Sequence, residues 1–127
     1  MRPLVLYVGR YEETISLIEK AMRLNPRYPA LYLVFLGAGY HATGRSEEAI
    51  TACKKALALN PDSWPAHLIP AITYIELGRE EEARAEAAEV LRLNPNFSVD
   101  VWKQRTPVKD PAVLEQWIAA LRKAGLK

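Results

Sequence analysis

The chain has little cysteine, no long apolar run and no long run of charge of one sign, and each of these scarcities excludes a class of protein. It holds one cysteine, Cys53, which cannot form an internal disulfide and fits a reducing cytoplasm. No apolar run reaches the ~18 residues of a membrane span, because residues 31–40 are interrupted by tyrosine and glycine and end at His41. The 17 Lys and Arg and the 15 Asp and Glu are interspersed, which leaves no basic patch for nucleic acid. We therefore expect a cytoplasmic protein with neither a membrane nor a nucleic-acid partner.

Groups that carry out chemistry are scarce as well. His41 and His67 are the only histidines, and the chain has no His-x-x-x-His or Cys-x-x-Cys spacing, so we expect no zinc site. The acidic run at residues 80–82 has no partner base, and a place in the first turn of a helix accounts for it. We interpret Cys53 as a small buried hydrophobe and His67 as an aromatic stand-in packed between helices. No enzymatic activity and no cofactor are expected.

What the sequence does have is a threefold repeat. The pattern Gly-Arg-x-Glu-Glu begins at Gly9, Gly44 and Gly78, and these glycines lie 35 and then 34 residues apart. The triplet Leu-Asn-Pro recurs with the same two steps, at residues 24–26, 59–61 and 93–95. A fixed period near 34 residues is typical of stacked helical repeats. Each Asn-Pro pair is expected to end the second helix of its unit, because proline disfavours helical geometry before it and donates no hydrogen bond.

The middle unit shows how the two helices of a repeat should meet. Apolar and small residues at i, i+3, i+4 and i+7 on either side of Gly44 predict two amphipathic helices that face each other. The first should run over about residues 30–43, end at Gly44 in a left-handed conformation, and be followed by a helix that the Ser46 hydroxyl caps. Gly37 and Ala49 remove side chain where the two backbones approach.

The sequence pattern of these repeated units resembles that of the tetratricopeptide repeat family. The family pattern is met in the middle unit by Leu36-Gly37, Tyr40, Ala49, Ala56 and Pro61, and in the third by Ala71, Tyr74, Ala83 and Pro95. The sequence departs from the family pattern at Leu33, Cys53, His67, Ala87 and Val90. The resemblance implies an all-α fold: an α-solenoid of antiparallel helix pairs, or α-α superhelix, with a C-terminal capping helix. Pro70 lies inside a predicted helix, so we expect a kink there or a helix that starts late.

The expected repeats divide the chain into four parts. Residues 1–27 form a truncated first repeat, 28–61 the second, 62–95 the third and 96–127 the C-terminal cap. Only about residues 3–8 remain of the first repeat's first helix. We interpret the chain as part of a longer protein, or as a gene start placed too late, in preference to an exposed apolar end, because terminal repeats normally carry a polar capping face.

Beyond Pro95 the period fails and a different pattern begins. Residues 97–102 predict a short helix, and Asp110 and Pro111 predict the N-cap and first turn of a last helix that ends at Gly125. That helix carries one apolar stripe, formed by Val113, Leu114, Trp117, Ile118 and Leu121. The stripe favours a capping helix on the last repeat, and the alternative is a docking helix for another chain.

The tail also carries a second resemblance. Residues 94–98, 109–112 and 121–126 are similar to the C-terminal end of repeat regions in bacterial class III adenylate or guanylate cyclase-like proteins and related winged-helix regulators. In those families a catalytic or DNA-binding domain precedes the repeats. The resemblance implies a regulatory segment that acts on catalysis only when joined to such a domain.

The tetratricopeptide resemblance also implies a binding surface. In that family the first helices of successive units line a concave groove, and here the facing residues are Leu31, Val34, Ala38, His41 and Ala42, then Pro65, Leu68, Ile72, Ile75 and Glu76. Members that clamp the acidic C-termini of chaperones line the groove with Lys, Arg and Asn, none of which stands here. We predict that Leu31, Val34, Ala38, His41, Leu68, Ile72, Ile75 and Glu76 bind a partner, because an exposed apolar patch marks an interaction site.

The sequence leaves the occupant of this groove open. It could be an amphipathic helix of a partner protein, a segment of a preceding domain, a second copy of the chain, or the chain's own C-terminal helix folded back. The leading hypothesis is a non-enzymatic module that binds a protein or peptide segment. The alternatives are the cyclase-like regulatory segment and a homo-oligomer that forms through the truncated first repeat.

Overall fold

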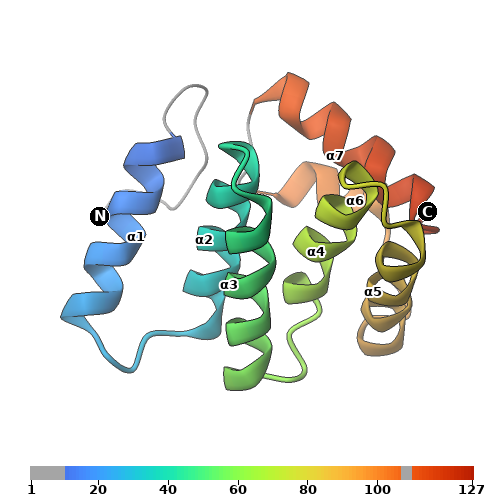
Figure 1. The fold of residues 1–127 in the computed structure, drawn as a ribbon. Helices are drawn as coiled ribbons and strands as arrows, with labels where there is room; N and C mark the ends of the chain where they lie inside the picture. The colour runs from blue at the N-terminus through green and yellow to red at the C-terminus, as the bar shows by residue number, and fades with distance from the viewer. Residues whose placement is uncertain (1–10, 107–109) are drawn as a thin grey trace.

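The computed structural model describes residues 11–106 and 110–127, and its regular elements there are all helices (Figure 1). They are α1 Tyr11–Leu24, α2 Ala30–Ala42, α3 Ser46–Leu59, α4 Pro65–Glu76, α5 Glu80–Leu93, α6 Val99–Arg105 and α7 Pro111–Lys123. The predicted all-α fold is confirmed. Within the described ranges, none of these helices has both the length and the apolar composition to cross a membrane. The helix expected over residues 3–8 lies outside the described residues.

The helices stack as pairs in chain order. α2 packs against α3 and α4 against α5, and α1 packs on α2 as the second helix of the preceding unit would. The first helices, α2 and α4, contact each other, whereas α1, α3 and α5 make their main contacts with these first helices. The stack therefore curves, with α2 and α4 on its inner, concave side.

The recurring Gly-Arg-x-Glu-Glu pattern builds the turn inside each pair. Gly44 has a φ of +80°, the left-handed conformation predicted for it. The next residue, Arg45, donates its backbone N–H to the Tyr40 carbonyl at 2.8 Å, lays its guanidinium over the Tyr40 ring at 4.4 Å, and forms a two-pronged hydrogen bond with Glu48. The following unit repeats the arrangement with Gly78, Tyr74, Arg79 and Glu82. The repeated polar residues thus have a structural role.

Two local predictions are wrong. Ser46 is the first residue of α3, Arg45 occupies the cap position, and no side chain forms a hydrogen bond at that cap. The serine hydroxyl therefore sits one position too far along the helix to cap it. α4 begins at Pro65 and continues through Pro70, so the late helix start is wrong, while the alternative, a kink at Pro70, stays a prediction.

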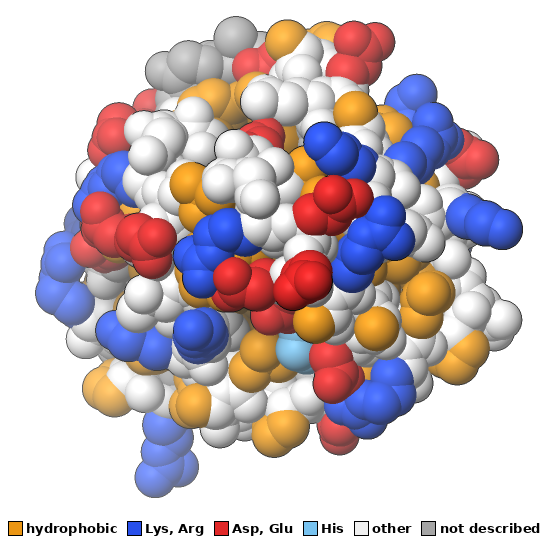
Figure 2. All heavy atoms as spheres, turned by 45° about the vertical axis from the view of Figure 1, so that its right-hand side comes forward, with side chains coloured by type: hydrophobic (Ala, Val, Ile, Leu, Met, Phe, Trp, Pro, Cys, Tyr) orange, Lys and Arg blue, Asp and Glu red, His pale blue; other side chains and the backbone are white. Residues whose placement is uncertain are grey.

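Charged side chains cover the outer helices in mixed order. Figure 2 shows Lys, Arg, Asp and Glu side chains side by side on one face, with hydrophobic atoms between them. On α5, Glu80 pairs with Arg84 at 3.1 Å and Glu89 with Arg92 at 2.5 Å. Such exposed pairs contribute only about 0–1 kcal/mol each, so they add little to the stability of the stack.

The contact between α2 and α3 depends on a missing side chain. A Cβ atom on Gly37 would lie 2.8 Å from the Cys53 sulfur and 3.2 Å from the Ala49 carbonyl oxygen. Both distances are shorter than ordinary contacts, and Ala49 and Cys53 are fully buried. The predicted close approach of the two backbones at Gly37 is confirmed.

We expect Gly37→Ala to destabilise the protein. Overpacking costs about 1–3 kcal/mol, and the better helix propensity of alanine returns only ~1 kcal/mol. At a net loss of about 1 kcal/mol, the middle of the resulting range, a thermal melt should show a midpoint lowered by roughly 3–5 °C. The double variant Gly37→Ala with Cys53→Ala should be less destabilised than the two single effects added, because the sulfur is gone. A Gly37→Ala protein as stable as the original would contradict this account of the contact.

Candidate functional site

The C-terminal segment folds back onto the concave side of the stack. α7 makes its main contacts with α4 and α6 (Figure 1, red). Its Trp117 is 1% exposed and meets the ring of His41 on α2 edge-on, with the ring centroids 5.2 Å apart. Ile118 and Leu121 of the predicted apolar stripe are buried as well. Of the occupants that the sequence left open, the chain's own last helix lies on part of this face.

Hydrogen bonds hold this segment at both ends. The Asp110 side chain accepts a bond from the Ala112 N–H at 3.1 Å, so the predicted cap of α7 is confirmed. The Tyr11 hydroxyl of α1 donates to the same carboxylate at 2.9 Å, and burial together with this carboxylate raises the pKa of Tyr11 to about 12. At the other end, the Val99 N–H donates to the Lys127 carbonyl at 2.9 Å, which joins the start of α6 to the end of the chain.

The part of the concave face beside α7 contains a polar cluster. His41 is 7% exposed, with Nδ1 3.0 Å from the Thr73 hydroxyl and Nε2 3.0 Å from a Glu76 carboxylate oxygen. Burial lowers the pKa of His41 to about 4 and raises that of Glu76, so the histidine is neutral at pH 7. Ile72 is fully buried and Ile75 is partly buried. Of the predicted groove residues, His41 and Glu76 therefore belong to this cluster, and Ile72 and Ile75 do not line a cavity on this face.

The other predicted groove residues line a cavity that remains open. We call it the open pocket; its volume is about 280 Å³. From α2 it is lined by Leu31, Val34, Phe35 and Ala38, and from α4 by Pro65, Leu68 and Ile69. The remaining lining residues are Trp64, Trp102, Arg105, Thr106 and Trp117. Leu31 is 47% exposed, whereas Val34, Ala38 and Leu68 are buried in the walls.

Aromatic residues form much of the wall of this pocket, and the sequence analysis singled out only Trp117 among the tryptophans, as part of the stripe on the last helix. The chain has three tryptophans, and all three line it: Trp64 just before α4, Trp102 on α6 and Trp117 on α7. They come from separate elements, so no local spacing could reveal that they meet. The available signal was weaker: neither Trp64 nor Trp102 is accounted for by the repeat pattern.

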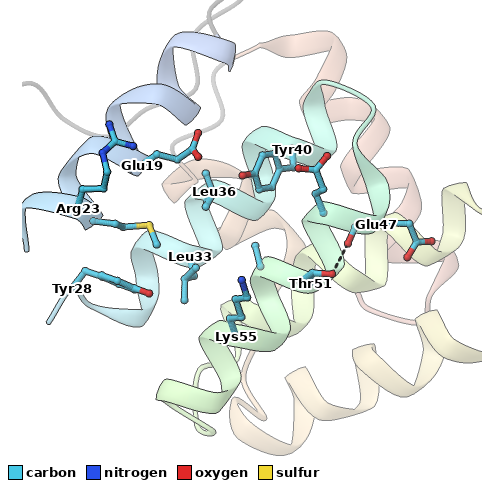
Figure 3. A pocket seen from close by; sticks show the side chains of 12 residues that line it. Glu19, Arg23, Tyr28, Leu33, Leu36, Tyr40, Glu47, Thr51 and Lys55 are labelled. Atoms are coloured by element: carbon cyan, nitrogen blue, oxygen red, sulfur yellow. Dashed lines mark hydrogen bonds between the residues drawn. The ribbon is translucent and has the colours of Figure 1, made fainter. Parts of the chain in front are cut away.

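A second hollow lies between α1 and α3, with α2 as its floor (Figure 3). Its volume is about 560 Å³. Leu33 and Leu36 of α2 form an apolar floor, while Glu19 and Arg23 of α1 and Lys55 of α3 form a charged rim (Figure 3). The rim carries charges of both signs, so its chemistry selects no particular ligand.

The structure shows the surroundings of Cys53 and His67, the side chains that the sequence analysis considered for chemical roles. Cys53 is fully buried, and burial raises the pKa of its thiol, so it packs as a small hydrophobe as predicted. His67 is more than an aromatic stand-in, because its Nδ1 lies 2.6 Å from a Glu86 carboxylate oxygen. Over residues 11–106 and 110–127, no cluster of three His, Cys, Asp or Glu side chains is arranged to hold a metal ion.

The buried histidine predicts a pH dependence of stability. His41 binds a proton near pH 6.5 in the unfolded chain but only near pH 4 in the folded one, so folding loses stability as the pH falls from about 6.5 towards 4. At ~1.4 kcal/mol per pH unit, the free energy of unfolding should lose up to about 2 kcal/mol between pH 7 and pH 5. Urea unfolding of the original chain and of His41→Gln at both pH values measures this.

His67→Gln is the matched control, because it also replaces a histidine that hydrogen-bonds a carboxylate. It should retain the decline that His41 causes, whereas His41→Gln should lack it. An equal decline in the original chain and in His41→Gln would show that His41 is not the group responsible.

Comparison with solved structures finds repeat proteins of the same fold. The second TPR domain of human RPAP3, solved in complex with an HSP70 peptide, is 22% identical, with a TM-score of 0.66 over 94% of this chain and 84% of that one. The first TPR of Spaghetti, bound to an HSP90 peptide, is 24% identical, with a TM-score of 0.67 over 91% and 78%. A thermophilic TPR protein of Thermus thermophilus is 29% identical, with a TM-score of 0.63 over 90% of this chain and 51% of that one.

Sequence comparison identifies the family. No curated protein sequence matches the chain at a significant level. Two sequence models described as Tetratricopeptide repeat do match, one over residues 40–103 and the other over residues 4–63. The first match alone spans half of the chain, and the turns and helix pairs described above have the expected 34-residue spacing. The chain belongs to the tetratricopeptide repeat family.

Proposed function

We propose that this chain is a non-enzymatic interaction module that holds an apolar segment of a partner protein in the open pocket. The observation that carries the proposal is a cavity on the inner face of a tetratricopeptide stack whose walls are almost entirely apolar. Leu31 stands half exposed among its lining residues, where an incoming segment would cover it. Full burial of an exposed leucine contributes about 1.5–3 kcal/mol, so covering the exposed half of Leu31 would contribute about 0.7–1.5 kcal/mol to binding.

Similar structures support a peptide partner. The RPAP3 domain was solved with the HSP70 peptide SGPTIEEVD and the Spaghetti domain with the HSP90 peptide SRMEEVD. Both peptides are acidic at their C-terminal ends. The residues predicted to face the groove from α2 and α4 include no Lys, Arg or Asn, so we propose an apolar segment as the principal ligand of this chain.

The eight predicted partner-binding residues divide into two groups in this proposal. Leu31, Val34, Ala38 and Leu68 line the open pocket and would contact the partner directly. His41 contacts Trp117 and Glu76 pairs with His41, so their contribution would be to position the wall that Trp117 forms, while Ile72 and Ile75 do not line the pocket. We therefore assign binding to the first group.

The other functional hypotheses remain predictions. The cyclase-like relation depends on the tail residues alone. Self-association would involve the truncated first repeat, residues 1–27, of which residues 1–10 lie outside the described ranges. Binding at the open pocket requires neither a cyclase-like domain nor self-association, and it can be tested directly with substitutions in the pocket.

We expect Leu31→Glu to weaken partner binding without unfolding the protein. The side chain is 47% exposed, so the charge does not enter the core, but an unpaired carboxylate at an apolar contact costs about 1–3 kcal/mol. Binding to an array of overlapping peptides, scored against the original chain, should fall by about ten- to a hundredfold for the peptides that it retains.

Leu91→Glu on α5 is the matched control. It makes the same substitution in a helix, at a side chain that is 40% exposed and does not line the open pocket. It should bind as the original chain does. Equal binding by all three proteins would place the contact elsewhere.

A further inference from the structure

The open pocket is small for a separate ligand and suited to one side chain. Its volume of about 280 Å³ lies just below the ~300–1,000 Å³ of sites that enclose small molecules. Trp64, Trp102 and Trp117 give it broad aromatic walls. Aromatic pairs gain about 0.5–1.5 kcal/mol beyond their buried area when they stack offset or edge to face, so an aromatic ring is the side chain that these walls favour.

One charge stands in this apolar lining. Arg105, the last residue of α6, is the only charged residue among those that line the open pocket, and it is exposed. Among the described residues, no carboxylate forms an ion pair with it. Its guanidinium is always protonated and offers five N–H donors arranged for a carboxylate.

Of the seven other arginines that the structure describes, five form ion pairs, and the remaining two, Arg23 and Arg27, do not line the open pocket. Arg45, Arg79, Arg84, Arg92 and Arg122 each pair with a glutamate or an aspartate of the chain. Arg105 differs because it combines an unpaired guanidinium with a place at an apolar cavity. Next to low-dielectric walls a charge pair is stronger than one surrounded by water.

We propose that the partner segment anchors itself with an aromatic side chain in the open pocket and an adjacent carboxylate on Arg105. This inference rests on the proposed function and adds to it the chemistry that selects the partner: an acidic residue beside an aromatic one. The cation comes from α6, outside the first helices that line the groove, so the repeat pattern does not encode it.

The three tryptophans provide the readout. Their indole N–H groups give three signals in a ¹⁵N-correlated NMR spectrum, and all three side chains line the pocket. The probes are blocked pentapeptides: Ser-Asp-Phe-Asp-Ser, its Asn counterpart Ser-Asn-Phe-Asn-Ser, and Ser-Asp-Ala-Asp-Ser. An aspartate on each side of the phenylalanine makes the test independent of whether the carboxylate precedes or follows the aromatic residue in the partner.

The Asp-Phe-Asp peptide should shift the indole signals saturably. The Asn counterpart should bind about five- to tenfold more weakly, since it lacks the charge-assisted bond, and the alanine peptide should cause no saturable shift. Arg105→Gln should abolish the difference between the Asp and Asn peptides. Arg92→Gln, an exposed arginine on α5 away from the pocket, should preserve it.

Each contrary result overturns the inference. Equal affinity for the Asp and Asn peptides, or a preference that survives Arg105→Gln, would remove the carboxylate from the proposal. Indole signals unmoved by both phenylalanine peptides would remove the aromatic anchor. Three dispersed indole signals in peptide-free Arg105→Gln verify that the variant is folded.

The peptide-array experiment with Leu31→Glu separates this failure from that of the proposed function. If Leu31→Glu loses partner capture while the Asp and Asn peptides bind alike, the pocket binds partners through other chemistry. If Leu31→Glu binds as the original chain does, the proposed function fails together with the inference.

Discussion

The inner helices are apolar on every side, and the rest of the structure depends on covering them. α2 contains no Asp, Glu, Lys or Arg, and α4 contains only Glu76. A helix that is hydrophobic all round is normally buried by its neighbours. The second helices α1, α3 and α5 cover the outward side of this inner layer. The inward side needs a cover of its own, and the chain supplies it from its C-terminus.

That cover is tight in one part and incomplete in another. Around His41 the polar atoms are matched to Thr73 and Glu76, and no buried side-chain nitrogen or oxygen in the described residues lacks a hydrogen-bond partner. Towards Leu31 the cover ends, and the open pocket remains. The pocket is therefore a consequence of how far α7 and α6 extend over the inner layer. Its apolar character follows from that of α2 and α4.

The sequence predicted what local patterns encode. The left-handed Gly44, the buried Cys53, the close approach at Gly37 and the Asp110 cap follow from short-range rules, and the structure has them. The cap at Ser46 failed because such rules locate a helix start only to within a residue or two.

The candidate site was predicted in part, for a different physical reason. The tetratricopeptide resemblance implied a groove along the first helices of the repeats, and Leu31, Val34, Ala38 and Leu68 of the predicted residues line the open pocket. The apolar stripe on α7 predicted that this helix packs against other residues, but it did not predict which surface of the protein it contacts. Trp64, Trp102 and Arg105 enter the site through tertiary packing alone, so no spacing in the chain brings them together.

The energetics of α7 decide which part of the inner face a partner can reach. Trp117, Ile118 and Leu121 are nearly or fully buried, and at about 1.5–3 kcal/mol each their exposure would cost about 5–9 kcal/mol. This is comparable to the whole stability of an ordinary domain, about 5–15 kcal/mol. A partner that displaced α7 would have to supply this energy before gaining any affinity, whereas one that enters the open pocket leaves α7 in place. Trp117 packs against His41 and also forms part of the wall of the open pocket. An occupant of the pocket therefore also stabilises α7 in its docked position. Binding and folding are linked through this one side chain.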